Sequence, residues 1–221
     1  MNTASQSRIS RKVEVRKLTI VGMLSAISII LSLTPIGYIP INPVVNLTIM
    51  HIPVIIGGIL EGPIVGATIG AVFGLTSLFR AITTPTVTNF IFINPLVSVI
   101  PRMSLGVISY YMYTWINSIF EKIISKKIKN SDKKNKKLKI IPSAMTGIIA
   151  TLSHTGMVLG MAYIIYAQRY AQAYISLNPS ASGFNPAYIL FGIVGANAIP
   201  EAILAAFIVG SVVTVIKTVK R

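Results

Sequence analysis

The sequence predicts an all-α membrane protein, a bundle of six transmembrane helices with both termini in the cytoplasm, and we treat residues 1–221 as a single membrane domain. Three observations support this prediction. Apolar residues make up 53% of the chain and charged residues 11%, whereas an ordinary soluble domain has about 25% charged residues. Long apolar stretches alternate with short polar segments. Seventeen of the twenty Lys and Arg residues lie in segments that flank those stretches.

Six apolar segments are candidates for membrane spans, each of which needs about 20 helical residues. The first is somewhat short and ends before Pro35, and the second is shorter still. Glu61, Gly62 and Pro63 predict a tight turn between the second and third spans. The predicted spans are residues 18–34, 48–60, 64–82, 95–120, 140–167 and 185–216.

The basic residues predict the orientation. Lys and Arg concentrate in residues 1–17, in residues 121–140 and at the end of the chain, and six spans place all three segments on the same side. Basic loops stay in the cytoplasm, so this is the cytoplasmic side. The Lys-rich loop has the composition of a disordered linker, and we expect it to attract anionic membrane lipid. The loops 35–47, 83–94 and 168–184 are then extracellular.

Several classes of function are disfavoured by what the sequence lacks. Cys is absent, which removes disulfides and Cys-ligated metals. Neither His51 nor His154 has a companion at metal-ligand spacing, so we expect no metal and no cofactor. A phosphate loop and a pair of intramembrane carboxylates are also missing, which argues against catalysis. Basic residues confined to loops argue against nucleic acid as a partner.

Small residues recur at four-residue spacing on two spans. Gly66, Gly70 and Gly74 share one face of the third span, where they predict a close interface inside the bundle. Gly22 and Ala26 repeat the pattern on the first span, and there the partner could be another chain.

Two arginines lie within predicted spans, where a charge costs several kcal/mol. Arg80 is near the outer end of its span and could extend to the interface. Arg102 follows Pro101, which loosens the helix, and lies about 10 Å deep. It either binds internally, to Glu201 or to freed carbonyls, or it contacts an anionic ligand at the mouth of a pocket.

A second polar group lies on the sixth span. Asn197 and Glu201 share a helix face, and Pro200 frees the carbonyl of Ala196, which predicts a kinked polar patch. Glu201 is about 22 Å from the outer start of that span, so we expect it below a pocket. His154 is a candidate pocket donor or a structural histidine, and His51 is expected at the interface.

Several segments, taken in order, resemble the substrate-binding S components of energy-coupling factor transporters. They are the small face of the first span, the loop TPIGYIPINPVVNLTIMHIPVIIGGILEGP, the glycine-rich third span, NPLVSVIPR and GANAIPEAI. The resemblance covers essentially the whole chain. It implies a cell-membrane protein that binds one vitamin from outside and delivers it with a membrane scaffold subunit and two cytoplasmic ATPases.

The resemblance also implies roles for individual residues. Gly22 and Ala26 match the surface that meets the scaffold, and residues 35–50 match a gate over the pocket. IPINP, TIMHIPVII and INPLVSVIPR are most similar to pantothenate-type members, and Arg102 would bind the carboxylate. The other predicted binding residues are Asn46, Thr48, Arg80, Asn94, His154, Tyr163 and Asn197, with Phe92, Tyr163 and Tyr188 as apolar walls and Pro101, Pro200 and Glu201 in structural or gating roles. Asn94 could equally cap the fourth helix.

Other functions stay open at this point. The substrate could be a different vitamin or precursor, of the riboflavin, folate, cobalamin or niacin class. A membrane-embedded enzyme acting on a lipid is a second class, with His154 and Glu201 as an acid and base, although a second carboxylate is missing. An autonomous facilitator is a third class, which inverted repeats and ion-coupling acids would normally accompany.

Overall fold

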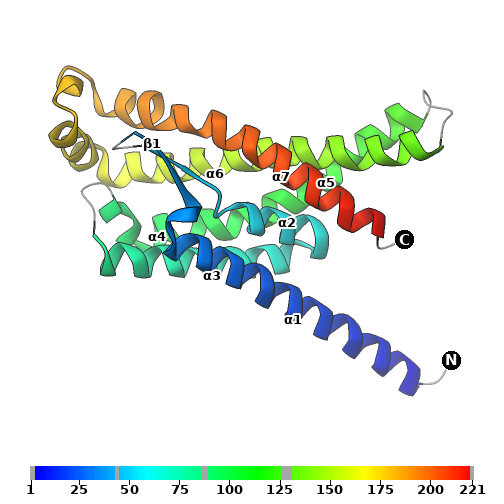
Figure 1. Ribbon diagram of the computed structural model, residues 1–221. Helices are drawn as coiled ribbons and strands as arrows, with labels where there is room; N and C mark the ends of the chain where they lie inside the picture. Colours follow the sequence, from blue (N-terminus) through cyan, green and yellow to red (C-terminus); the bar gives the residue numbers. More distant parts are fainter. Residues whose placement is uncertain (1–2, 43–44, 86–88, 126–130, 220–221) are drawn as a thin grey trace.

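The computed structural model describes residues 3–42, 45–85, 89–125 and 131–219. It is a bundle of helices with one short antiparallel hairpin, β1–β2 (Figure 1). The hairpin pairs Tyr38 with Thr48 and Ile39 with Leu47. The main elements are α1 (Thr3–Leu33), β1 (Tyr38–Asn42), β2 (Val45–Thr48), α2 (Ile52–Glu61), α3 (Pro63–Thr83), α4 (Pro95–Ser98), α5 (Ile100–Ser125), α6 (Ser131–Leu177) and α7 (Ala198–Val219).

The two ends of the bundle differ in what they contain. Figure 1 shows the beginning of α1, the end of α5, the beginning of α6 and the end of α7 at one end. The segments between α3 and α4 and between α6 and α7 lie at the other end. The basic segments of the sequence therefore gather at one end of the molecule, as a single orientation in a membrane requires.

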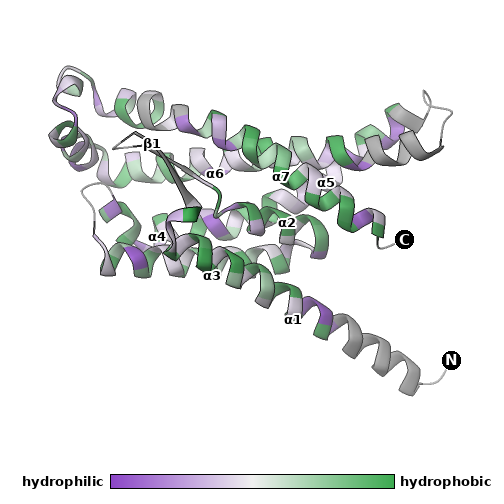
Figure 2. Ribbon diagram, viewed as in Figure 1, coloured by the Kyte–Doolittle hydropathy of each residue, from purple (hydrophilic) through white to green (hydrophobic). Residues whose placement is uncertain are grey.

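The structure confirms a helical protein with membrane-spanning character. Four helices are long and apolar enough to cross a membrane, namely Glu14–Leu33 within α1, α3, Lys139–Leu177 within α6, and α7. In Figure 2 the green of hydrophobic residues recurs along the ribbons of α3 and α7. Helix α2 has ten residues and is shorter than a full span. A helix overlaps each of the six predicted spans, but the count of six crossings stays a prediction.

Three predicted segments have different structures. Helix α6 is broken at Tyr166, which has non-helical dihedral angles, and resumes to Leu177, so the predicted outer loop 168–184 is helical over more than half of its length. The Lys-rich loop is largely helical on both sides of residues 126–130, which lie outside the described residues. Lys is a good helix former, so the high charge of this segment does not by itself prevent a helix.

The third difference concerns the last span. Residues Tyr188–Val194 form a π-helical turn and Gly195–Asn197 a 3-10 turn, so α7 begins only at Ala198. Gly192 and Gly195 lie in this stretch, and glycine in a helix interior is unfavourable by about 0.5–1 kcal/mol relative to alanine. The predicted span is therefore helical from residue 186 onward, but it is irregular before Ala198, where π and 3-10 turns replace the expected regular α-helix.

The glycine face of α3 packs closely against α5, as the sequence predicts. A Cβ atom on Gly70 would lie 2.0 Å from the carbonyl oxygen of Arg102, and one on Gly66 would lie 2.9 Å from Cα of Gly106. A side chain at either position would force the two backbones apart. Gly62, with φ of 105°, makes the turn from α2 into α3. These contacts fix the place of Arg102 in the bundle.

Candidate functional site

A small polar cavity lies where six parts of the chain meet. Its volume is about 170 Å³. Its walls come from the segment that joins β2 to α2, from α3, α5, α6 and α7, and from η2, a 3-10 turn at Asn89–Ile93. The lining residues are Thr48, Met50, His51, Phe73, Ser77, Phe92, Arg102, His154, Thr155, Val158, Leu159 and Glu201. The cavity therefore contains one cation, one carboxylate, two imidazoles and three hydroxyl groups.

Arg102 is held in the cavity by the irregular start of α5. Pro101 has no N–H group, so the carbonyl of Val97 has no helical donor. The N–H of Arg102 itself bonds to the Val99 oxygen. The side chain compensates, because Nη1 donates to the Val97 oxygen at 3.0 Å and to the Ser98 oxygen at 2.8 Å. The freed carbonyls expected from the sequence are thus among its partners.

Two aromatic rings flank the guanidinium of Arg102. Its Cζ atom lies 5.1 Å from the ring centroid of Phe73 and 4.7 Å from that of Phe92. The residue is 5% exposed. Rings and carbonyls together stabilise a cation that is largely removed from water, and they leave it in the wall of the cavity. An arginine in this setting is suited to bind a carboxylate.

Glu201 lies in the first turn of α7, where the helix dipole stabilises a negative charge. Its Oε1 atom accepts a hydrogen bond from the backbone N–H of Thr48 at 2.6 Å and another from the Thr48 hydroxyl at 2.8 Å. One carboxylate oxygen therefore holds the end of β2 against α7. No ion pair joins Glu201 to Arg102, two residues that the structure describes, so that alternative from the sequence is wrong.

Two expectations for the start of α7 are corrected. Glu201 lines the cavity and does not lie below it, because the start of α7 lies against the end of β2, whose Thr48 also lines the cavity. Pro200 lies in the first turn of α7, directly after the 3-10 turn Gly195–Asn197, so the backbone is irregular where the sequence predicts a kink. Asn197 ends the preceding 3-10 turn and is not among the lining residues.

Two histidines stack in one wall of the cavity. The rings of His51 and His154 have centroids 5.9 Å apart and planes inclined by 12°. Nε2 of His51 lies 3.0 Å from Oγ1 of Thr151. Nε2 of His154 is buried without a hydrogen-bond partner among the described residues. His51, at 2% exposed, is thus in the core and not at the interface, because α2 is buried on nearly all sides.

Several predicted binding residues lie outside the cavity lining. Arg80 donates from Nη1 to the carbonyl of Ser32 and so joins α3 to the end of α1. Asn94 caps α4, accepting from the N–H of Leu96 at 3.0 Å. Tyr163 is 41% exposed and packs on Phe191.

Two further predicted residues do not add to the lining either. Tyr188, a predicted wall, is 51% exposed and packs on Phe184. The side chain of Asn46 lies outside the described residues. Of the predicted polar set, the cavity brings together Thr48, Arg102, His154 and Glu201, and Phe92 is its predicted apolar wall.

The residues that sequence reasoning missed are those that accompany the charged ones. Ser77 lies on α3 one turn after Phe73, and Thr155 follows His154 on α6. Phe73 has no individual signal, because an aromatic residue in an apolar span is ordinary. A rule that every buried arginine needs aromatic or carbonyl neighbours would have suggested searching for such a ring on the facing helix.

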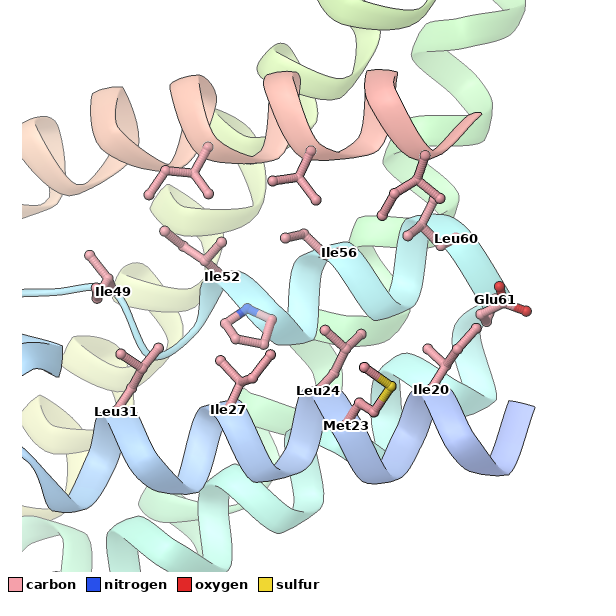
Figure 3. A pocket seen from close by; sticks show the side chains of 14 residues that line it. Ile20, Met23, Leu24, Ile27, Leu31, Ile49, Ile52, Ile56, Leu60 and Glu61 are labelled. Carbon is pink, nitrogen blue, oxygen red and sulfur yellow. The ribbon is translucent and has the colours of Figure 1, made fainter. Parts of the chain in front are cut away.

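A second hollow, a groove, is apolar and opens on another part of the surface. It lies between α1, α2 and α7 and has a volume of about 450 Å³ (Figure 3). Isoleucine, leucine, methionine and valine side chains make nearly all of its lining, and in Figure 3 Ile27 of α1 and Ile56 of α2 are among those that point into it. At one end lies Glu61, whose Oε1 pairs with Nη2 of Arg16 at 2.6 Å.

The small residues Gly22 and Ala26 of α1 are exposed. A Cβ atom on Gly22 would meet no heavy atom within 4 Å among the atoms described, and Ala26 is exposed. Met23 and Ile27, which follow them, line the groove. Helix α1 therefore presents both a small-residue face and one wall of the groove.

The chain is similar to two known transporters and matches one family model. The chain is 25% identical over 188 residues to a pantothenic acid transporter, PanT, of Lactococcus lactis subsp. cremoris, an alignment that covers 79% of this chain and 77% of that protein. It is 39% identical over 77 residues to a pantothenate transporter, PanT, of Leuconostoc mesenteroides, with 33% of this chain and 38% of that protein covered. The family model for the substrate-specific component of ECF transporters matches residues 16–213. The chain therefore belongs to the family of substrate-specific components of ECF transporters, multi-pass proteins of the cell membrane.

Proposed function

We propose that this protein is the pantothenate-binding subunit of an ECF-type importer and that the polar cavity is its binding site. The observation that supports this most is a buried arginine in a small cavity that also offers hydroxyl, imidazole and apolar groups. Pantothenate combines a carboxylate, an amide, two hydroxyls and a pair of methyl groups, so it needs such a mixture. The similarity to two proteins named for pantothenate transport points the same way.

Each part of the vitamin has a complement in the cavity. Arg102 binds the carboxylate, His154 and Thr155 bond to its amide and hydroxyl groups, and Phe73 with Phe92 contacts the methyl groups. The size of the cavity favours a small substrate, since about 170 Å³ is below the roughly 300–1,000 Å³ of ordinary ligand pockets. Cobalamin, folate and riboflavin, with their large ring systems, fit this volume poorly.

The hairpin acts as the gate of the cavity. Thr48 lies at the end of β2 and lines the cavity, and its two hydrogen bonds to Glu201 hold the hairpin in place. Substrate from outside enters when these bonds open. Arg80, Asn94, Asn197 and Tyr163 then have structural roles, since none of them is among the lining residues.

We also propose six membrane crossings with the basic end of the bundle in the cytoplasm. Helix α5 supplies one crossing and α2 a short one, in addition to the four long apolar helices. The partners are a membrane scaffold subunit and two ATPases that supply the energy. The scaffold docks on α1 through Gly22 and Ala26, with the neighbouring apolar groove as part of the same surface.

Calorimetry on the purified protein tests the substrate. We expect pantothenate to bind at one molecule per chain and to be the small molecule that mass spectrometry finds after purification, whereas niacin and riboflavin do not bind. Liposomes that contain the protein alone should not accumulate pantothenate. Tight binding of another vitamin without pantothenate binding would contradict the substrate, and accumulation without ATPases would contradict the role as a subunit.

A further inference from the structure

Two opposite charges face the same small cavity and have different partners. The guanidinium of Arg102 donates to the carbonyls of Val97 and Ser98, and the carboxylate of Glu201 accepts from Thr48. Both residues line the cavity, and both are buried, Arg102 at 5% exposed and Glu201 at 9%. A substrate in this cavity therefore meets a positive group and a negative group within the same small volume.

The carboxylate of Glu201 has capacity left for a substrate. A carboxylate offers about four lone-pair positions, and Thr48 occupies two of them, both on Oε1. A hydroxyl or N–H group of the substrate can donate to the remaining positions. An anionic group at that end of the substrate has no hydrogen to donate. It would also meet the like charge of Glu201 in a site from which water is largely removed.

We propose that Glu201 determines the charge class of the substrate: it selects a monocarboxylate that carries a hydroxyl donor away from its carboxylate, and it excludes compounds with a second negative charge there. This inference rests on the proposed function, because pantothenate belongs to that class. Phosphorylation of its primary hydroxyl would convert the donor into an anion. The importer would thus accept the free vitamin and reject its phosphate ester.

A substitution can remove the charge of Glu201 without removing its hydrogen bonds to Thr48. Glu201→Gln keeps an oxygen that can accept both hydrogen bonds from Thr48, but it removes the negative charge. Glu61→Gln is the matched control, because Glu61 is a carboxylate that lines the apolar groove and not the cavity. Both variants lose one charge from a half-buried or buried position, and only the first changes the cavity.

The experiment measures the affinity ratio between pantothenate and its phosphate ester by competition against labelled pantothenate. Like charges within about 8 Å at an effective dielectric constant near 20 predict that Glu201→Gln reduces this ratio by about tenfold or more. Glu61→Gln should leave the ratio unchanged. In the unmodified protein, an analogue with an amine in place of the primary hydroxyl should bind at least as tightly as pantothenate. This last measurement needs no variant and so does not depend on whether Glu201→Gln folds.

Each outcome has one meaning. If the unmodified protein binds pantothenate but the ratio is the same in Glu201→Gln, or if the amine analogue binds much more weakly than pantothenate, the charge-selection inference is overturned and the proposed function stands. If the unmodified protein does not bind pantothenate at all, the proposed function fails and the inference fails with it.

Discussion

The cavity and the groove share the chain segment from Thr48 to Ile52, yet they differ in chemistry. Thr48, Met50 and His51 line the cavity, whereas Ile49 and Ile52 line the groove. Charged, imidazole and hydroxyl side chains belong to seven of the twelve residues that line the cavity, whereas the lining of the groove is almost entirely aliphatic. Polar groups at specific positions can select one small molecule, whereas an apolar surface of this size suits a lipid or a protein helix.

Under the proposed function, this difference means that vitamin binding and docking to the scaffold use separate surfaces. A substitution in the cavity should change affinity for the vitamin, and one on α1 should change only its delivery. The shared segment is short, so the two surfaces lie close together. A gate that opens at Thr48 would also move Ile49 and Ile52, and with them one wall of the groove.

The largest expected effect comes from α1. We expect Gly22→Leu and Ala26→Leu to leave pantothenate binding unchanged and to abolish uptake by cells that carry the whole transporter, because a bulky side chain prevents close approach of another helix. Labelled pantothenate measures uptake, and calorimetry on the purified variants measures binding.

Gly156→Leu is the matched control for this pair. It places the same side chain on α6, where a Cβ atom on Gly156 would also meet nothing within 4 Å among the described atoms. Its uptake should be close to that of the unmodified protein. Normal uptake by Gly22→Leu and Ala26→Leu would show that α1 is not the docking surface. The division of roles between the cavity and the groove would then be wrong.

The second largest expected effect is a loss of pantothenate affinity, caused by a substitution in the cavity. Arg102→Ala should weaken pantothenate binding by about 1.5–3 kcal/mol, the scale of a hydrogen bond to a charged group. Arg102→Lys should recover only part of this, because an ammonium group lacks the planar geometry that matches a carboxylate. Calorimetry gives both values.

Arg80→Ala is the control for Arg102. Arg80 lies on α3, a helix that can span the membrane, but it bonds to Ser32 and does not line the cavity. Its loss should change pantothenate affinity little. Equal losses for the two arginines would show that Arg102 acts on the fold and not on the substrate.

The third expected effect concerns the packing between α3 and α5, which positions Arg102 in the wall of the cavity. Gly70→Ala places a Cβ atom 2.0 Å from the Arg102 oxygen, so the helices must separate. We expect a loss of about 1–3 kcal/mol in stability, together with weaker pantothenate binding. Thermal unfolding in detergent measures the first, and Gly183→Ala, where the added atom meets nothing within 4 Å among the described atoms, is the control.

Three features were predictable from the sequence: the helical class, the glycine interface, and the two polar residues Arg102 and His154. Each of them depends on composition or on spacing along one helix. Arg102 was identified through its neighbour Pro101, whose effect on the backbone is local. Such signals need no knowledge of what lies across the bundle, and they are the ones that the sequence conveys well.

The start of α7 could not be predicted for the opposite reason. Residues 185–197 are apolar enough to continue a helix, and their π and 3-10 turns arise where they pack against α6. The place of Glu201 beside the cavity and its bonds to Thr48 depend on contact between segments 153 residues apart, which spacing along one helix does not convey. His51 was misplaced because the burial of α2 depends on helices far away in the sequence.

The smallest expected effect tests the bond that closes the cavity. Thr48→Val removes the hydroxyl that donates to Glu201 at 2.8 Å but keeps the backbone N–H bond at 2.6 Å and the shape of the side chain. Hydrogen bonds inside membrane proteins contribute about 0.6 kcal/mol on average, and at most about 1.7. We therefore expect pantothenate to dissociate about two- to threefold faster, as stopped-flow fluorescence would record, with uptake by the whole transporter nearly unchanged. Thr68→Val is the control, since its hydroxyl bonds only to its own helix, at the Ile64 oxygen. If dissociation is faster in both variants, or in neither, the bond between Thr48 and Glu201 does not control the gate. It would then stabilise the hairpin without setting how long the vitamin stays bound.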